Sequence, residues 1–254
     1  LLDSDLDVEY HVAEYLRGLK DRPFGDRYFR ESTRPVLPLE SHESIGEHLR
    51  VLEKLARRLP DGEGLNLLFF GPPGVGKTES AHSLATRFDL KAYEIGNFSR
   101  DDERSASSKR LVALRVCRES VDLKRAMIIV DEADELLNGD AGLGRGGRNT
   151  EKNLINEALD QRRGLVVWIT NTHEYIAEST RRRFDYAVEF PKFSRRQRQL
   201  AWTNALKKYG LDQHVPPEEV DRLAVTYAIS AGGIDVAARN CQKLTSDERD
   251  GKDC

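Results

Sequence analysis

A glycine-rich segment that ends in lysine and threonine carries the clearest chemical signal in the sequence. It fits the phosphate-binding pattern GxxxxGK[ST] and follows an apolar stretch. Its glycines let backbone N–H groups point at phosphate oxygens, and Lys77 is expected to reach the β- and γ-phosphates of a nucleotide. Thr78 is expected to place its hydroxyl on Mg²⁺. The predicted nucleotide-binding residues here are Gly71, Pro72, Pro73, Gly74, Val75, Gly76, Lys77 and Thr78.

Two adjacent carboxylates follow a second apolar stretch, Met127–Val130. A buried parallel strand delivers the residues at its carboxyl end to the crevice where ligands bind. Asp131 is therefore expected to hold Mg²⁺ through water, and Glu132 to orient the attacking water. Acidic residues after a strand also serve the start of a helix, and we assign that role to Asp134 and Glu135. Together with the phosphate site, these residues predict Mg²⁺-dependent nucleotide hydrolysis.

Short apolar stretches alternate with helical patterns around these motifs. This alternation is typical of an α/β fold with a parallel sheet sandwiched between helices. The predicted strands are Leu65–Phe70, Lys91–Ile95, Met127–Val130 and Val166–Thr170. The predicted helices are Ile45–Leu59, Thr78–Phe88, Ser107–Cys117 and Asn153–Leu159.

The same signals divide the chain into three regions. Residues 1–40 are polar and interrupted by prolines, so we expect an N-terminal extension. Residues 41–192 hold the α/β nucleotide-binding core. From 193 to 254 the pattern is helical only, which predicts a small all-helical C-terminal domain.

The composition of the 254 residues excludes several classes of protein. The longest apolar runs are far shorter than the roughly 20 residues that span a bilayer, so we expect no membrane span. Cys117, Cys241 and Cys254 are widely spaced, which argues against disulfides and a zinc site and favours a reducing, cytoplasmic location. A net charge of −3 gives no global attraction for nucleic acid. Because the chain begins with Leu1-Leu2, we expect it to be a fragment.

From about Ile45 to Cys241, this sequence resembles the AAA+ ATPases in its motifs. Residues 71–78 resemble the Walker A motif of that family, and 127–132 its Walker B motif. The strand that ends at Asn171 resembles its sensor 1, where an asparagine contacts the γ-phosphate and the attacking water. An amide suits that role because it can both donate and accept a hydrogen bond. The resemblance implies a P-loop NTPase fold with a helical lid, and ATP, ADP and Mg²⁺ as ligands.

The segment Thr180–Asp185 resembles the end of the family's second region of homology, which carries an arginine finger. In the family this finger reaches into the ATP site of the neighbouring subunit. The segment is shorter than the usual form, so counting forward from Asn171 selects Arg182 and counting back from Phe184 selects Arg183. Both stay candidates. The resemblance thus implies a homo-oligomer, expected to be a hexameric ring.

Two further regions differ from the family pattern. The lid contains Gly233 in place of a sensor 2 arginine, so Gly233 is expected to contact the nucleotide, with Arg239 as the alternative. Phe98 occupies the place of the family's central pore loop, but its neighbours are polar and charged. This aromatic side chain either grips a substrate or anchors its own loop.

The resemblance leaves the partner of the protein open. We expect ATP hydrolysis to drive remodelling of a protein partner. One alternative is DNA, as in the loader and initiator ATPases, although no DNA-binding module is recognisable. A second is a nucleotide-gated scaffold with little hydrolysis, which the complete set of catalytic residues disfavours. The third alternative is a metabolite kinase, which Asn171 and the arginine-rich turn disfavour.

Overall fold

The computed structural model describes residues 28–33, 39, 43–57, 64–96, 106–138 and 147–250. Most of the predicted N-terminal extension, residues 1–40, lies outside these ranges, as does Phe98. No helix among the described residues is long and apolar enough to cross a membrane.

The chain forms two compact units, and the glycine-rich loop belongs to the unit that contains the C-terminal helices. The first unit comprises Leu1–Phe70 and Thr78–Val188, and the second comprises Gly71–Lys77 and Glu189–Cys254. The predicted boundaries at residues 40 and 192 stay predictions.

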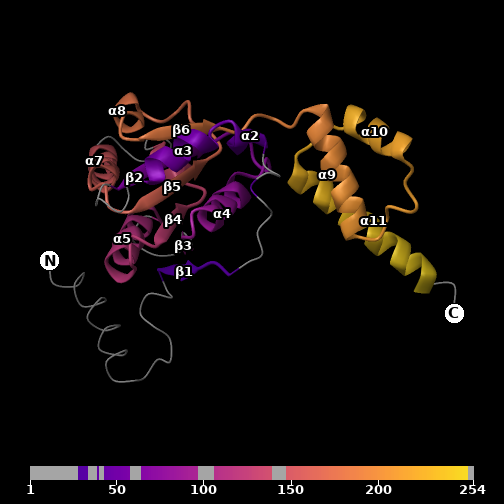
Figure 1. Cartoon of the computed structure of the whole chain (residues 1–254), viewed down its shortest axis with the longest axis horizontal. Helices are drawn as coiled ribbons and strands as arrows, with labels where there is room; N and C mark the ends of the chain where they lie inside the picture. The colour runs from indigo at the N-terminus through magenta and orange to yellow at the C-terminus, as the bar shows by residue number, and fades with distance from the viewer. Residues whose placement is uncertain are drawn as a thin grey trace, which may run out of the picture. The chain divides into compact units, whose positions relative to one another are not determined.

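One six-stranded sheet organises the first unit, with the strand order β1-β3-β4-β5-β2-β6 (Figure 1). Strands β3, β4, β5 and β2 are parallel neighbours, whereas β1 pairs antiparallel with β3. The carboxyl ends of the four parallel strands therefore lie at one edge of the sheet. The strands are β1 (Phe29–Glu31), β2 (Leu65–Phe70), β3 (Lys91–Ile95), β4 (Ala126–Val130), β5 (Leu165–Thr170) and β6 (Tyr186–Glu189).

Helices α5, α6 and α7 pack their apolar side chains against one face of this sheet, where Ile128, Val130 and Trp168 belong to the same buried cluster. Met127 and Ile129 alternate with them along β4 and are also fully buried. The strand is therefore covered on both faces, which explains its continuous apolar sequence. The helices are α2 (Glu43–Gly46), α3 (Leu49–Ala56), α4 (Lys77–Arg87), α5 (Ala106–Ser120), α6 (Asp134–Leu137), α7 (Gly147–Asp160) and α8 (Glu178–Arg181).

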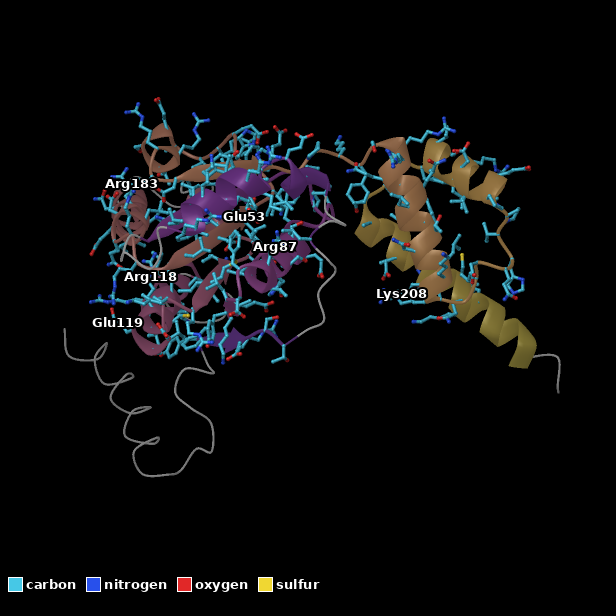
Figure 2. All side chains as sticks on the ribbon, viewed as in Figure 1. Glu53, Arg87, Arg118, Glu119, Arg183 and Lys208 are labelled. Carbon is cyan, nitrogen blue, oxygen red and sulfur yellow. The ribbon has the colours of Figure 1, made fainter. Side chains whose placement is uncertain are left out.

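The structure confirms the predicted α/β class and the four predicted strands, and it differs elsewhere, including the short helix α8, which was not predicted. The edge strands β1 and β6 were not predicted, because each is short and largely exposed and so lacks an apolar run. The predicted helix Ile45–Leu59 is instead two helices, α2 and α3, separated by Glu47 and His48. Helix α3 is tied to α4 by an ion pair of 3.2 Å between Glu53 and Arg87 (Figure 2).

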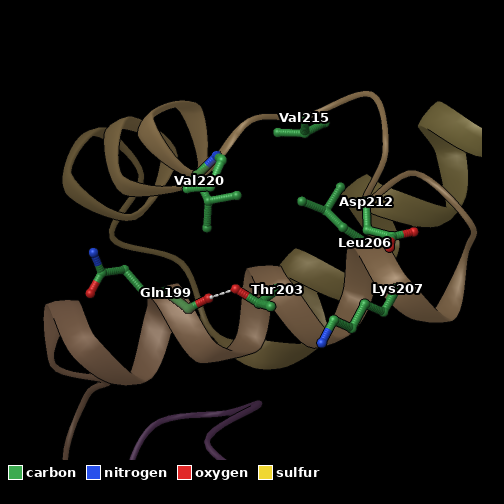
Figure 3. Close-up of a pocket in the computed structure, with 8 residues that line it drawn as sticks. Gln199, Thr203, Leu206, Lys207, Asp212, Val215 and Val220 are labelled. Atoms are coloured by element: carbon green, nitrogen blue, oxygen red, sulfur yellow. Dashed lines mark hydrogen bonds between the residues drawn. The ribbon is translucent and has the colours of Figure 1, made fainter.

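The C-terminal part of the second unit contains three helices, α9 (Arg195–Lys208), α10 (Pro217–Thr226) and α11 (Ala231–Asp250). Ser194 and Gln197 form a capping box that begins α9. A common apolar core contains one residue from each helix, namely Trp202, Ala224 and Ile234. A groove between α9 and α10 is lined by residues that include Gln199, Thr203, Leu206 and Val220 (Figure 3).

A buried amide in β2 yields a prediction about stability. Asn66 is fully buried, donates to Leu159 O at 2.9 Å and accepts from Trp168 Nε1 at 3.2 Å. The change Asn66→Ala leaves both partners buried without that hydrogen bond, so we expect the free energy of unfolding to fall by about 2–4 kcal/mol. Urea unfolding measures this, with the exposed Asn153→Ala as control, expected within about 0.5 kcal/mol of wild type. Equal changes in the free energy of unfolding of the two variants would refute the prediction.

Candidate active site

The glycine-rich loop begins at the residue directly after β2. Gly71, Gly74 and Gly76 have φ angles of 140°, 76° and 91°, which lie in the region that favours glycine. A Cβ atom on Gly71 would lie 2.1 Å from the carbonyl oxygen of Phe190, and one on Gly74 would lie 2.3 Å from Ser230 Oγ. The backbone path of the loop therefore depends on these glycines, as a phosphate-binding loop requires.

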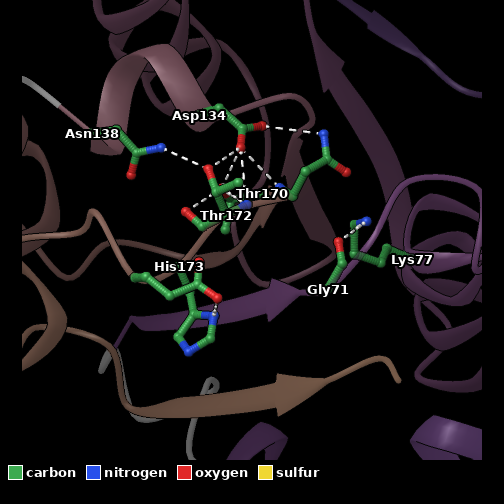
Figure 4. Close-up of polar contacts among 9 residues, drawn as sticks. Gly71, Lys77, Asp134, Asn138, Thr170, Thr172 and His173 are labelled. Atoms are coloured by element: carbon green, nitrogen blue, oxygen red, sulfur yellow. Dashed lines mark hydrogen bonds and ion pairs between the residues drawn. The ribbon is translucent and has the colours of Figure 1, made fainter. Parts of the chain in front are cut away.

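Lys77 ends this loop with its side chain folded back over it. The side chain is largely buried, at 6% exposure. Its Nζ donates hydrogen bonds to Gly71 O at 2.7 Å and Pro72 O at 2.8 Å (Figure 4). The loop thus keeps a positive charge beside the N-terminus of α4, a position that attracts anions.

The side-chain oxygens of Thr78 and Asp131 lie together at the end of β4. Thr78 Oγ1 donates to Asp131 Oδ2 at 2.8 Å. A hydroxyl and a carboxylate suit Mg²⁺, which prefers oxygen ligands and keeps several waters. The described residues contain no group of three or more His, Cys, Asp or Glu side chains that could hold a metal. Thr78 and Asp131 are therefore the side chains among the described residues that would hold such an ion.

The backbone turns sharply at Glu132, directly after Asp131. Glu132 has a φ of 49°, a left-handed conformation that is uncommon for a residue other than glycine. Its N–H donates to Asp131 Oδ1 at 2.8 Å, and the next N–H, of Ala133, donates to Ile169 O at 2.7 Å. The Glu132 side chain is exposed. Strained backbone of this kind concentrates at functional sites.

Asp134 joins the start of α6 to the end of β5. Its carboxylate accepts hydrogen bonds from Thr170 Oγ1 at 2.8 Å, from the N–H of Asn171 at 2.9 Å and from the N–H of Thr172 at 3.1 Å (Figure 4). The side-chain amide of Asn171 also reaches it, at 3.4 Å. Asp134 lies in the first turn of α6, as expected, but its contacts with β5 were not foreseen. The carboxylate therefore fixes the loop that carries Asn171 to the turn that carries Glu132.

The hydrogen bonds to Asp134 predict a pH dependence of stability. Burial raises the pKa of Asp134, but hydrogen bonds from Thr170, Asn171 and Thr172 outweigh it and hold the pKa below its ordinary 3.8. Such a carboxylate stabilises the fold above the unfolded pKa and loses this contribution as the pH falls through the folded pKa. We expect Asp134→Asn to lower the free energy of unfolding near pH 7, and the gap to wild type to shrink below about pH 4. Urea unfolding at several pH values measures the difference in unfolding free energy between the two proteins. A difference that stays constant with pH would contradict the prediction.

The two candidate arginine fingers lie after α8 and have different surroundings. The side chain of Arg182 is 73% exposed and pairs with Glu178 on its own helix. The side chain of Arg183 is 30% exposed, and its Nε donates to Asp160 Oδ1 at 2.8 Å at the end of α7 (Figure 2). Arg183 is therefore tied to α7, whereas the one partner of Arg182 among the described residues is the exposed Glu178, four positions earlier.

Within the second unit, the start of α11 approaches the glycine-rich loop. Ser230 Oγ lies beside Gly74, and it accepts a hydrogen bond from the N–H of Gly233 at 3.4 Å. Arg239 lies farther along α11 and is exposed. Between them, Asp235 accepts hydrogen bonds from Lys208 Nζ at 2.7 Å and from the hydroxyl of Tyr209, directly after α9, at 3.0 Å. The predicted roles of Gly233 and Arg239 toward a nucleotide stay predictions.

Strand β2, the glycine-rich loop and α4 define a P-loop nucleotide-binding module, with paired carboxylates after β4. Residues 67–192 match the model of the family described as "AAA: ATPase family associated with various cellular activities (AAA)". The chain belongs to this family of ATPases, which confirms the resemblance found in the sequence.

Similar proteins extend the comparison. Protein SUPPRESSOR OF K(+) TRANSPORT GROWTH DEFECT 1 of Arabidopsis thaliana is 31% identical over 134 residues, covering 49% of this chain and 30% of that protein. The Replication factor C large subunit of Thermococcus kodakarensis is 27% identical over 159 residues, covering 62% and 28%. A chain in the solved E. coli MS115-1 HORMA:CdnC:Trip13 complex shares the fold, with a TM-score of 0.57, 17% identity and coverage of 80% and 82%. This chain spans less than a third of either of those two sequence relatives.

Proposed function

We propose that this chain hydrolyses ATP to ADP and phosphate in a Mg²⁺-dependent reaction. The observation that carries the proposal is the 2.8 Å contact between Thr78 Oγ1 and Asp131 Oδ2. This contact joins the helix that follows the glycine-rich loop to the carboxylates after β4. Membership of the AAA ATPase family supports the same reaction.

Each residue of the site has a role in this proposal. Lys77 and the N–H groups of the loop bind the β- and γ-phosphates, and Thr78 and Asp131 hold the metal. Mg²⁺ held by these residues would neutralise negative charge on the phosphates. Glu132 orients the attacking water and accepts its proton. Asn171 donates to the γ-phosphate from the end of β5.

An arginine from a second copy of the chain completes the site in this proposal. Arg182 is favoured as the finger over Arg183, because it is exposed and its partner Glu178 lies one turn away. Exposed ion pairs contribute little, so Arg182 can exchange this partner for a phosphate at low cost. Arg183 would have to leave Asp160. The proposed assembly is a ring of identical chains, hexameric by analogy with the family.

Remodelling of a protein partner is the proposed use of this hydrolysis, and a cytoplasmic location remains a prediction. Similarity to a replication factor C subunit favours DNA as the second candidate partner. The two are distinguished by binding of the purified chain to duplex DNA at increasing salt. Affinity that falls steeply with salt would favour DNA. Absence of binding at low salt would favour a protein.

Phosphate release by the purified chain tests the proposed reaction. We expect multiple turnovers with ATP and Mg²⁺, and a loss of at least about 100-fold in Lys77→Ala, because the cation at the phosphates is removed. Lys124→Ala is the matched control, since Lys124 is exposed and precedes β4 at the opposite end of that strand. Release that is equal in Lys77→Ala and wild type would exclude this site, and no release by the wild type would leave the scaffold hypothesis.

A further inference from the structure

Arg110 on α5 is a buried cation that contacts the site and has no role in the reaction proposed above. Its side chain is only 6% exposed. Its Nη1 donates to Glu132 O at 2.8 Å, and its Nη2 donates to Asp131 O. One guanidinium thus binds two successive backbone carbonyls at the point where β4 ends.

These two carbonyls lie beyond the hydrogen-bonded ladders of the sheet. The pairing of β4 with β5 ends at Val130, and its pairing with β3 ends at Ile129. Buried carbonyls need a partner, and a planar guanidinium has N–H groups spaced to serve two acceptors at once. Arg110 therefore provides the hydrogen bonds that a neighbouring strand no longer supplies where the chain leaves the sheet.

The cost of burying Arg110 indicates that its position matters. Burying a guanidinium costs free energy unless hydrogen bonds offset it. Both hydrogen bonds of Arg110 go to the turn at Asp131 and Glu132, while its Nε is buried without a hydrogen-bond partner among the described residues. The left-handed conformation of Glu132, with a φ of 49°, is costly for a non-glycine residue and requires support from its surroundings.

We propose that Arg110 is a positioning residue for ATP hydrolysis, which holds the Asp131–Glu132 backbone in the conformation that aims the Glu132 carboxylate at the attacking water. The inference rests on the proposed function. Both hydrogen bonds of Arg110 go to backbone carbonyls of this turn, so its effect passes through Glu132. Loss of the guanidinium lets the turn relax, and the carboxylate moves away from the water while the loop that binds phosphates stays in place.

The same helix provides a matched control. Arg118 is 3% exposed, and its Nη1 donates to Ala158 O at 2.9 Å and to Gln161 Oε1 at 3.3 Å (Figure 2). Arg118 therefore also binds a backbone carbonyl, but at the end of α7 rather than at the turn after β4. Arg118→Ala measures the cost of removing a buried arginine from α5 without disturbing the turn at Glu132.

Steady-state kinetics of the full chain, with thermal unfolding alongside, separate positioning from stability. For Arg110→Ala we expect kcat to fall about 10- to 100-fold with KM for ATP within about 2-fold, because misplacing a reacting group costs turnover rather than binding. Arg110→Lys keeps the charge but cannot bridge both carbonyls, and is expected to fall between Arg110→Ala and wild type. Arg118→Ala is expected to keep kcat within about 2-fold while melting at a lower temperature.

A double variant tests whether Arg110 acts through Glu132. In a chain that already carries Glu132→Gln, adding Arg110→Ala is expected to lower kcat by a further factor of less than about 3. The effects of two residues that act as a unit are not additive. Full additivity, an unchanged kcat in Arg110→Lys, or an equal loss in Arg118→Ala would overturn the inference alone. Absence of hydrolysis by the wild type would overturn the proposed function and this inference with it.

Discussion

Replacing Glu132 by glutamine is expected to lower kcat by about 10³-fold while ATP stays bound. Glutamine keeps the size of the side chain but cannot accept a proton from the attacking water, and a positioned general base is worth about 10²- to 10⁴-fold. Lys77, Thr78 and Asp131 are unchanged, so the affinity for Mg²⁺-ATP is retained. Phosphate release measures turnover, and a fluorescent ATP analogue measures binding.

The neighbouring Glu135→Gln is the control for this change. Glu135 is exposed in the first turn of α6 and lies one residue beyond Asp134. Its removal is expected to leave kcat within about 2-fold, in keeping with exposed positions away from the reaction. Undiminished turnover in Glu132→Gln would refute the role of Glu132, and equal losses in both variants would show a general effect of charge at α6.

The second large effect is expected at Arg182. An arginine that neutralises charge on the transferred phosphoryl is worth about 10³-fold or more in kcat. We therefore expect Arg182→Ala to lower kcat to that extent at protein concentrations where the wild type is assembled. Phosphate release per chain, measured across a range of protein concentrations, tests this.

Arg183→Ala provides the comparison within the same turn. This change removes the contact with Asp160 and is expected to lower the melting temperature, with kcat of the folded chain within about 5-fold of wild type. The reverse order, with the larger loss of turnover in Arg183→Ala, would assign the finger to Arg183. Equal kcat in both variants and wild type would contradict a site shared between chains.

The central strands were predictable because their burial leaves a local signature. Leu65–Phe70 and Lys91–Ile95 were predicted with the bounds that the structure shows, and β4 and β5 each to within one residue. Helices cover both faces of the sheet, so β4 and β5 are apolar at every position or nearly so. The glycine-rich loop was predictable for a related reason, since its backbone path excludes side chains at Gly71 and Gly74.

The remaining features depend on tertiary contacts that no local pattern reports. Arg110 is separated from Glu132 by 22 positions, and Asp134 from Thr170 by 36. The sequence predicted Asp134 only at the start of a helix, and it gave no signal for Arg110. Their roles emerge only because parallel strands bring the ends of β4 and β5 to one edge of the sheet. Strand β6 was missed because it alternates exposed and buried positions over a short length.

Hydrolysis of ATP at a site completed by a neighbouring chain is tested most directly by mixing two inactive variants. Lys77→Ala chains keep Arg182 but lack the phosphate-binding lysine, and Arg182→Ala chains have the opposite defect. Random assembly of equal amounts makes about one site in four complete, since such a site needs one chain of each kind in one order. Phosphate release is therefore expected to recover to about a quarter of the wild-type rate, and a rate equal to the sum of the separate variants would contradict the shared site.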